Sequence, residues 1–314
     1  MILLSTLLKV WRLNISQIRE KKKYLQPEMV AMLDSISMKA KLVVEGYIIG
    51  QHRSPYHGFS VEFAEHRSYE PGDEVKHIDW KLYGKTNRLY VKRFEEETNL
   101  RAHLILDTSK SMTYASGKVT KLDYGSYLLA ALSYLMISQQ DAAGVVLFDE
   151  KIRSFIPPKS TPGHLNTLLN TLDVKQPGND TKIETVLHEM AERINKRGLV
   201  IIISDLLDDP KSILNGLKHF RHKNQEVILF HILDRNELEF DFNSRTKFID
   251  MESGAEITTD PWHIKTDYKN LILDLQKYYK SQCRHNNIDY VSLFTDDNLD
   301  KGLSEYFNKR QKLG

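Results

Sequence analysis

The sequence predicts an α/β protein built on a doubly wound, mostly parallel β-sheet. From residue 101 onward, short apolar runs alternate with segments of helical periodicity. Runs such as Ala142–Phe148 and Leu199–Ile203 are almost continuously apolar, which is typical of strands covered on both faces. The alternation of such strands with helices predicts a sheet between two helical layers, a Rossmann-like three-layer architecture.

The elements of this region follow one another in a regular order. The predicted strands are Ala102–Leu106, Ala142–Phe148, Lys151–Ile156, Leu199–Ile203, Glu226–Leu233, Lys247–Met251 and Ile288–Phe294. The predicted helices are Val119–Ser138, Thr161–Leu172, Lys182–Lys196, Pro210–His222, His263–Asn286 and 298–312. The second and third strands are separated only by Asp149 and Glu150, which favours a hairpin at this point.

Two segments precede this region, so we expect three parts in the chain. Residues 1–49 form an N-terminal helical extension, in which Pro27 opens a helical segment that ends near Gly46 or Gly50. Residues 50–100 form an irregular segment with one predicted strand, Tyr90–Phe94, and we expect it to pack on the main domain. Residues 101–314 form that domain.

Charge and composition exclude several classes of function. The chain has 44 basic and 42 acidic residues, but residues 1–25 alone carry six basic residues and one acidic residue. The remainder is slightly acidic, so nucleic-acid binding is not expected. The longest nearly apolar stretch, Tyr127–Ile137, is too short to span a membrane. Cys283 is the single cysteine and cannot form an internal disulfide, so we expect a cytoplasmic protein.

The apolar and basic segment Met1–Lys23 has two interpretations. It could form a helix docked on the body of the protein, because helices that cover a core share this pattern. It could also make a weak contact with a membrane surface, with Lys21–Lys23 supplying positive charge.

Three segments bring oxygen donors to the predicted carboxyl edge of the sheet. Asp107, Ser109 and Ser111 directly follow the first strand, and Asp205 follows the strand Leu199–Ile203. Thr181 precedes a later helix and adds a hydroxyl group. Ligands of parallel sheets bind at this edge, and hard oxygen donors suit Mg²⁺ or Mn²⁺. The alternative is that the loop after the first strand only caps a helix and forms a turn.

This constellation resembles the metal-ion-dependent adhesion site of von Willebrand factor type A domains. That family carries an Asp-x-Ser-x-Ser loop after the first strand, a Thr before a later helix and an Asp after the fourth strand. The resemblance implies that Ser109, Ser111 and Thr181 offer oxygens to the ion. It also implies that Asp107 and Asp205 bind directly or through water, and that an open position accepts a carboxylate of a partner protein.

The segment before the main domain resembles the signature of a more specific family. Pro71-Gly72-Asp73 and His77-Ile78-Asp79-Trp80 resemble the signature of the family called "domain of unknown function 58", whose members pair it with a type A-like domain. The likeness runs from about Ala40 to Phe294. It implies a partnership with a MoxR-type AAA+ ATPase that remodels or activates a client protein, which the sequence does not identify.

The signature itself has a structural and a functional interpretation. Its acidic and basic side chains could form ion pairs that pin the segment onto the main domain. It could instead present a surface to a partner. The candidates for the ion pairs are Glu62, Arg67, Asp73 and Asp79, and those for the partner surface are Arg53, Arg67 and Trp80.

No enzyme motif accompanies these features, so we expect a non-enzymatic interaction protein. Ser109 is flanked by Thr108 and Lys110, which excludes a Gly-x-Ser-x-Gly nucleophile elbow. The chain also has no Gly-x-x-x-x-Gly-Lys-Ser/Thr phosphate loop. A metal-dependent phosphoester hydrolase remains an alternative, and it would need further carboxylates near the metal loop, for which Asp208 and Asp209 are the candidates.

Overall fold

The computed structural model describes most of the chain in two compact units. The described residues are 25–51, 63–69, 78–94, 100–173, 183–242, 246–249 and 256–313. One unit comprises the described residues up to Gln51 together with Leu100–Leu313, and the other lies within His52–Asn99. The segment Met1–Lys23 lies outside the described residues, so both interpretations of it stay predictions.

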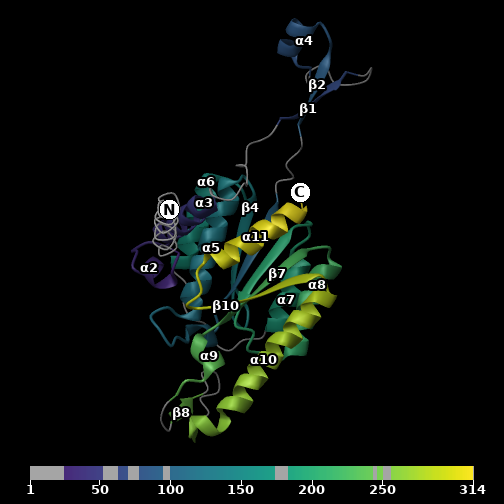
Figure 1. Cartoon of the computed structure of the whole chain (residues 1–314). Helices are drawn as coiled ribbons and strands as arrows, with labels where there is room; N and C mark the ends of the chain where they lie inside the picture. Colours follow the sequence, from purple (N-terminus) through teal and green to yellow (C-terminus); the bar gives the residue numbers. More distant parts are fainter. Residues whose placement is uncertain are drawn as a thin grey trace, which may run out of the picture. The chain divides into compact units, whose positions relative to one another are not determined.

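The larger unit is built on a six-stranded sheet in the order β10-β7-β6-β3-β4-β5. Figure 1 labels β10, β7 and β4 of this sheet among the helices around it. Neighbouring strands are parallel except for β5, which pairs antiparallel with β4. The strands are β3 (Arg101–Asp107), β4 (Ala142–Phe148), β5 (Ile152–Lys159), β6 (Leu199–Ser204), β7 (Glu226–Leu233) and β10 (Ile288–Phe294). This arrangement confirms the predicted doubly wound, mostly parallel sheet.

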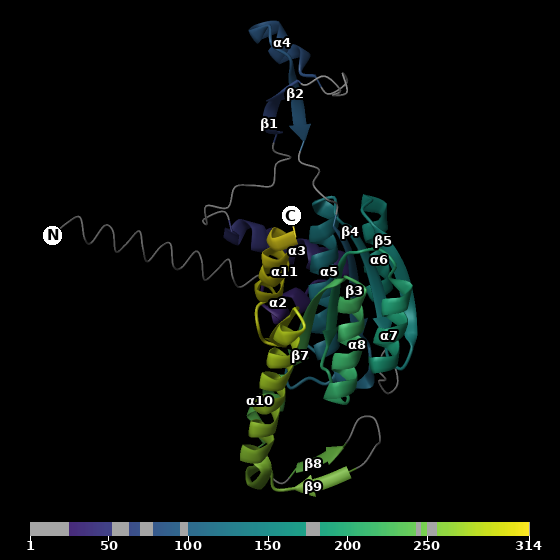
Figure 2. The same cartoon turned by 90° about the vertical axis from the view of Figure 1, so that its right-hand side faces the viewer.

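Helices cover both faces of this sheet (Figure 2). On one face lie α3 (Ile36–Gln51), α5 (Lys121–Ser138), α6 (Pro162–Asp173) and α11 (Asp300–Leu313). On the other lie α7 (Ile183–Arg193), α8 (Pro210–His222) and α10 (Pro261–His285). The described part of the N-terminal extension therefore shares a core with the main domain.

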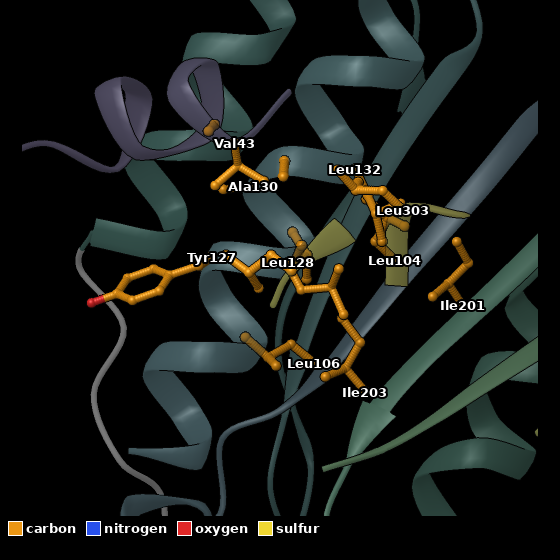
Figure 3. Packing of buried hydrophobic residues seen from close by; sticks show 14 of the residues in the cluster. Val43, Leu104, Leu106, Tyr127, Leu128, Ala130, Leu132, Ile201, Ile203 and Leu303 are labelled. Atoms are coloured by element: carbon orange, nitrogen blue, oxygen red, sulfur yellow. The ribbon is translucent and has the colours of Figure 1, made fainter. Parts of the chain in front are cut away.

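Successive side chains of each strand pack alternately on the two faces of the sheet. On β6, Ile201 and Ile203 pack toward α5, whereas Val200 and Ile202 pack toward α7 and α8. Figure 3 shows the first of these clusters, which includes Leu128 of α5 and Ile203 of β6. All of these side chains are fully buried, which explains why the strands read as continuous apolar runs.

The structure corrects two expectations about local structure. The helical segment that begins at Pro27 is two helices, α2 (Pro27–Ala31) and α3, because the chain turns at residues 32–35 and the Ser35 hydroxyl accepts the Met38 N–H. The predicted strand Lys247–Met251 is β8 (Thr246–Ile249), which does not join the main sheet. Its antiparallel partner is β9 (Glu256–Thr259). The short helix α9 (Arg235–Glu239) precedes both strands in the chain.

The smaller unit contains regular elements within the segment predicted to be irregular. β1 (Phe63–Ser68) pairs antiparallel with β2 (Tyr90–Phe94), the strand predicted from the sequence. Between them lies α4 (Trp80–Thr86). The predicted packing of this unit on the main domain stays a prediction. In neither unit does a described helix have the length and apolar character needed to cross a membrane.

Candidate metal centre

Four of the five predicted oxygen donors, those of Asp107, Ser109, Ser111 and Asp205, lie at or directly after the ends of two neighbouring strands. β3 and β6 are adjacent and parallel, with Leu106 opposite Ile203. Asp107 and Asp205 therefore leave the sheet side by side, at the edge where parallel sheets bind their ligands. Both side chains are buried.

The carboxylate of Asp107 organises the loop that follows β3. Its Oδ1 accepts the Ser109 N–H at 2.9 Å, and its Oδ2 accepts the Ser204 hydroxyl at 2.7 Å. Burial and the negative charge of Asp205 raise the pKa of Asp107 to about 7, although these hydrogen bonds act in the opposite direction. A cation at this place would favour the ionised form of the carboxyl group.

Two hydroxyl groups of the same loop lie next to each other. Ser109 Oγ and Ser111 Oγ share a hydrogen bond of 3.0 Å, in which either hydroxyl group can donate, and both side chains are buried. The short 3-10 turn η2 (Lys110–Thr113) brings Ser111 back toward Ser109. Adjacent ligands of an octahedral Mg²⁺ ion at about 2.1 Å lie about 3 Å from each other. The two hydroxyl groups therefore have the spacing of a pair of ligands.

The backbone carbonyl group of Asp205 accepts a hydrogen bond from a buried histidine. His231 Nε2 lies 3.0 Å from the Asp205 carbonyl oxygen, and His231 Nδ1 lies 2.7 Å from the Tyr290 hydroxyl. The carbonyl can only accept, so Nε2 carries the proton and Nδ1 accepts from the hydroxyl. Burial lowers the pKa of His231 to about 4, which keeps this imidazole neutral.

The residue after Asp205 has an unusual backbone. Leu206 is buried and has a φ of 54° in the left-handed region. Its N–H donates to the Ser204 hydroxyl at 3.0 Å, which maintains the turn. A side chain in this conformation is strained, and such strain concentrates at functional sites.

The structure adds Lys121 to the site, which the sequence did not indicate. Its Nζ lies 2.7 Å from Asp205 Oδ2 and 2.6 Å from Glu237 Oε1, and its side chain is fully buried. Burial alone would lower the pKa of Lys121, but the two carboxylates outweigh it and hold the pKa above its usual value. The sequence does show a lysine in a largely apolar helical segment, which is a signal of a buried charge. It does not show the partners of this lysine, which are 84 and 116 residues away along the chain.

Thr181, the third predicted hydroxyl donor, lies outside the described residues. The chain resumes at Ile183, whose N–H donates to Asp208 Oδ2 at 3.1 Å. Asp209 caps α8 by accepting the Ser212 N–H at 2.9 Å. Both carboxylates considered for a hydrolase thus accept N–H groups at helix starts.

The signature residues are only partly described. Asp79 caps α4 and accepts the N–H groups of Lys81 and Leu82. Trp80 is 58% exposed and contacts Tyr83 edge to face. Arg53, Glu62, Asp73 and the side chain of Arg67 lie outside the described residues, so a role for them stays a prediction.

These donors fit a hard divalent cation such as Mg²⁺. Within the described ranges, no group of three His, Cys, Asp or Glu side chains lies close enough to hold a metal ion. The candidate ligands described above are not such a group, because they combine two serine hydroxyl groups with carboxylates. The ionised carboxylates of Asp107, Asp205 and Glu237 would outnumber the Lys121 ammonium by two charges, which a divalent cation would balance.

The site and the sheet together define the class of the larger unit. It is a doubly wound α/β domain of the von Willebrand factor A-like kind, with an Asp-x-Ser-x-Ser loop after the first strand of the sheet and an Asp after the fourth. The chain belongs to the family described as "Protein of unknown function DUF58", whose pattern matches residues 65–277. The resemblance of the signature to this family is confirmed, and so is the predicted doubly wound, mostly parallel fold.

Relatives and solved structures are similar at low sequence identity. Uncharacterized proteins of Mycobacterium bovis and Mycobacterium tuberculosis are 24% identical over 240 residues, which is 75% of this chain and 75% of each relative. An aerotolerance-related membrane protein from Bacteroides fragilis has 15% identity and a TM-score of 0.48, over 68% of this chain and 99% of that chain. The SpRpn10 VWA domain has 13% identity and a TM-score of 0.35, over 66% and 95%.

Proposed function

We propose that this protein is a non-enzymatic protein-interaction module with a metal-ion-dependent adhesion-type site. Asp107, Ser109, Ser111 and Asp205 would hold a Mg²⁺ or Mn²⁺ ion, together with Thr181. When bound, such a hard cation offers an open position to a carboxylate of a partner protein.

The pair of serine hydroxyl groups carries this proposal. Ser109 Oγ and Ser111 Oγ are 3.0 Å apart beside the buried carboxylate of Asp107. A helix cap or a turn needs only one such side chain on a backbone N–H, and Asp107 already accepts the Ser109 N–H. The strained backbone at Leu206 further favours a functional site over a simple turn.

The site offers little for catalysis. A general base needs a free lone pair within reach of a substrate. His231, the imidazole next to Asp205, is engaged at both nitrogens. Leu207, an apolar residue two positions beyond Asp205, is 49% exposed, which suits contact with a protein surface.

The proposed partner is a MoxR-type AAA+ ATPase that acts with this chain on a client protein in the cytoplasm. Membership of the family supports this part of the proposal. A carboxylate of the ATPase or of the client would complete the ion's coordination, and the exposed side chain of Trp80 would add a second contact.

Metal binding is tested with the full chain and Mn²⁺ as the probe. The double substitution Ser109→Ala with Ser111→Ala removes the hydroxyl groups but keeps the N–H that Asp107 accepts. We expect Mn²⁺ affinity, measured by electron paramagnetic resonance, to fall by about tenfold or more. Ser133→Ala is the matched control, because this buried hydroxyl on α5 has no hydrogen-bond partner among the described residues.

The partnership is tested by titrating the wild type and the double variant with a MoxR-type ATPase from the same organism. The wild type should bind in Mg²⁺ and lose affinity in EDTA, whereas the variant should bind weakly in both. If the wild type and the double variant bind the ATPase with equal affinity, both with and without EDTA, the metal bridge is refuted. The partnership would then be independent of metal.

A further inference from the structure

A buried ammonium group lies beside the candidate metal ligands. Lys121 is the first residue of α5, and its side chain is 1% exposed. Its two acceptors are Asp205 Oδ2 at 2.7 Å and Glu237 Oε1 at 2.6 Å, with exposed side-chain fractions of 2% and 18%. Ions removed from water in this way are retained only where they neutralise each other.

The second carboxylate is held firmly in place. Glu237 belongs to the capping box of α9, and its Oε2 accepts the Asp234 N–H at 2.8 Å. Asp234 is itself buried and accepts the Ser116 N–H at 3.0 Å. The ammonium of Lys121 therefore connects the start of α5, the end of β6 and the start of α9.

The ammonium forms a hydrogen bond with one of the candidate ligands, Asp205. It donates to the carboxylates of Asp205 and Glu237, while the hydroxyl groups of Ser109 and Ser111 contact each other. A positive charge so near Asp205 repels any other cation that approaches this carboxylate. The same charge stabilises the carboxylates when no metal ion is present.

We propose that Lys121 is a built-in counter-cation of the candidate metal centre, which lets the domain fold without a divalent ion and lowers the affinity of the centre for that ion. The inference rests on the proposed function, because it concerns the ion held by Asp107, Ser109, Ser111 and Asp205. Lys121 acts through Asp205 and is thus a positioning residue, not a ligand.

The test is Lys121→Met, which keeps the length and apolar stem of the side chain but removes the charge. Thermal unfolding of the full chain is measured in EDTA and in increasing Mg²⁺, and Mn²⁺ affinity by electron paramagnetic resonance. We expect the melting temperature of the variant to fall in EDTA and to rise more steeply with Mg²⁺ than that of the wild type. We expect its Mn²⁺ affinity to increase by about tenfold.

Two further variants keep the test decisive. Lys118→Met removes an exposed lysine three residues earlier and should behave as the wild type. If Lys121→Met does not fold in EDTA, the pair Lys121→Met with Glu237→Gln removes one positive and one negative charge together. This pair should fold and still bind Mn²⁺ more tightly than the wild type does.

The outcomes separate this inference from the proposed function. An equal loss of stability at every Mg²⁺ concentration, with unchanged Mn²⁺ affinity, would show that Lys121 is only structural and would overturn the inference alone. If the wild type and all variants fail to bind Mn²⁺, the metal part of the proposed function is overturned as well.

Discussion

His103 is a buried residue in the middle of β3 with an incompletely satisfied side chain. It is 7% exposed, lies near the ring of Phe155 on β5, and its Nδ1 has no hydrogen-bond partner among the described residues. Burial, together with the positive charge of Arg101, lowers the pKa of His103 to about 4. The folded protein therefore keeps this imidazole neutral at pH values where the unfolded chain protonates it.

This difference predicts a contribution of His103 to acid sensitivity. A folded-state pKa below the unfolded value of about 6.5 gives stability that is present above pH 6.5 and lost as the pH falls toward 4. His103→Leu should remove this loss. The free energy of unfolding of the variant, relative to that of the wild type, should therefore be about 2 kcal/mol higher at pH 5 than at pH 7.5. Urea unfolding at several pH values measures the gain.

The exposed His263 provides the control for this prediction. His263→Gln replaces an exposed imidazole without changing the core, so the effect of His103→Leu must exceed the effect measured for this variant. Parallel curves for the wild type and His103→Leu over the same pH range would contradict the assignment of acid sensitivity to His103.

At the scale of elements, the close contact of α7 and α8 depends on a glycine. Gly216 lies on the buried face of α8, and a Cβ atom placed on it would lie 2.8 Å from Leu187 Cβ on α7. Ile213, Leu217 and Phe220 continue the same buried face. The missing side chain at Gly216 thus lets the two helices approach each other over β6 and β7.

We expect Gly216→Ala to lower the free energy of unfolding by about 1–3 kcal/mol, because an extra methyl group must push the packed helices apart. Alanine normally favours a helix over glycine by about 0.5–1 kcal/mol, so the expected sign is opposite to that of helix propensity. Chemical denaturation measures the change.

Gly163 on α6 is the matched control, since no atom lies within 4 Å of a Cβ placed on it. Gly163→Ala should be neutral or slightly stabilising. If both substitutions have the same effect, the spacing of α7 and α8 does not depend on Gly216.

Most elements could be predicted from the sequence, and the exceptions share a physical cause. β4, β7 and α8 have the predicted bounds, because burial on one or both faces leaves a local periodicity. β8 is a strand as predicted, but its residues pair with β9 outside the main sheet. Strand periodicity indicates burial and extension but carries no information about the pairing partner.

At the scale of the whole molecule, one carboxylate connects the first strand of the sheet with the C-terminal helix. Asp141 precedes β4 and is 1% exposed. It accepts the Leu100 N–H at 3.1 Å, the Tyr306 hydroxyl at 2.9 Å and Arg310 Nε at 2.8 Å. Tyr306 belongs to the core of α11, so the carboxylate fixes α11 on the main domain.

Asp141→Ala should therefore destabilise the larger unit by roughly 3–5 kcal/mol, the cost of removing one partner of a buried ion pair. Tyr306→Phe removes a single hydrogen bond and should cost about 1 kcal/mol. Chemical denaturation gives both values, and hydrogen exchange should show faster exchange in α11 of the Asp141 variant. Similar effects of the two substitutions would contradict the central role of Asp141.

The candidate site divides into a part that is local in sequence and a part that is not. By itself the sequence determines the sheet and the oxygen donors at its edge, because Asp107 and Asp205 directly follow apolar strands whose burial is visible in composition. Only the tertiary structure decides that Lys121 lies between Asp205 and Glu237. An ion pair between distant residues depends on folded geometry and burial, and neither leaves a periodic trace in the chain.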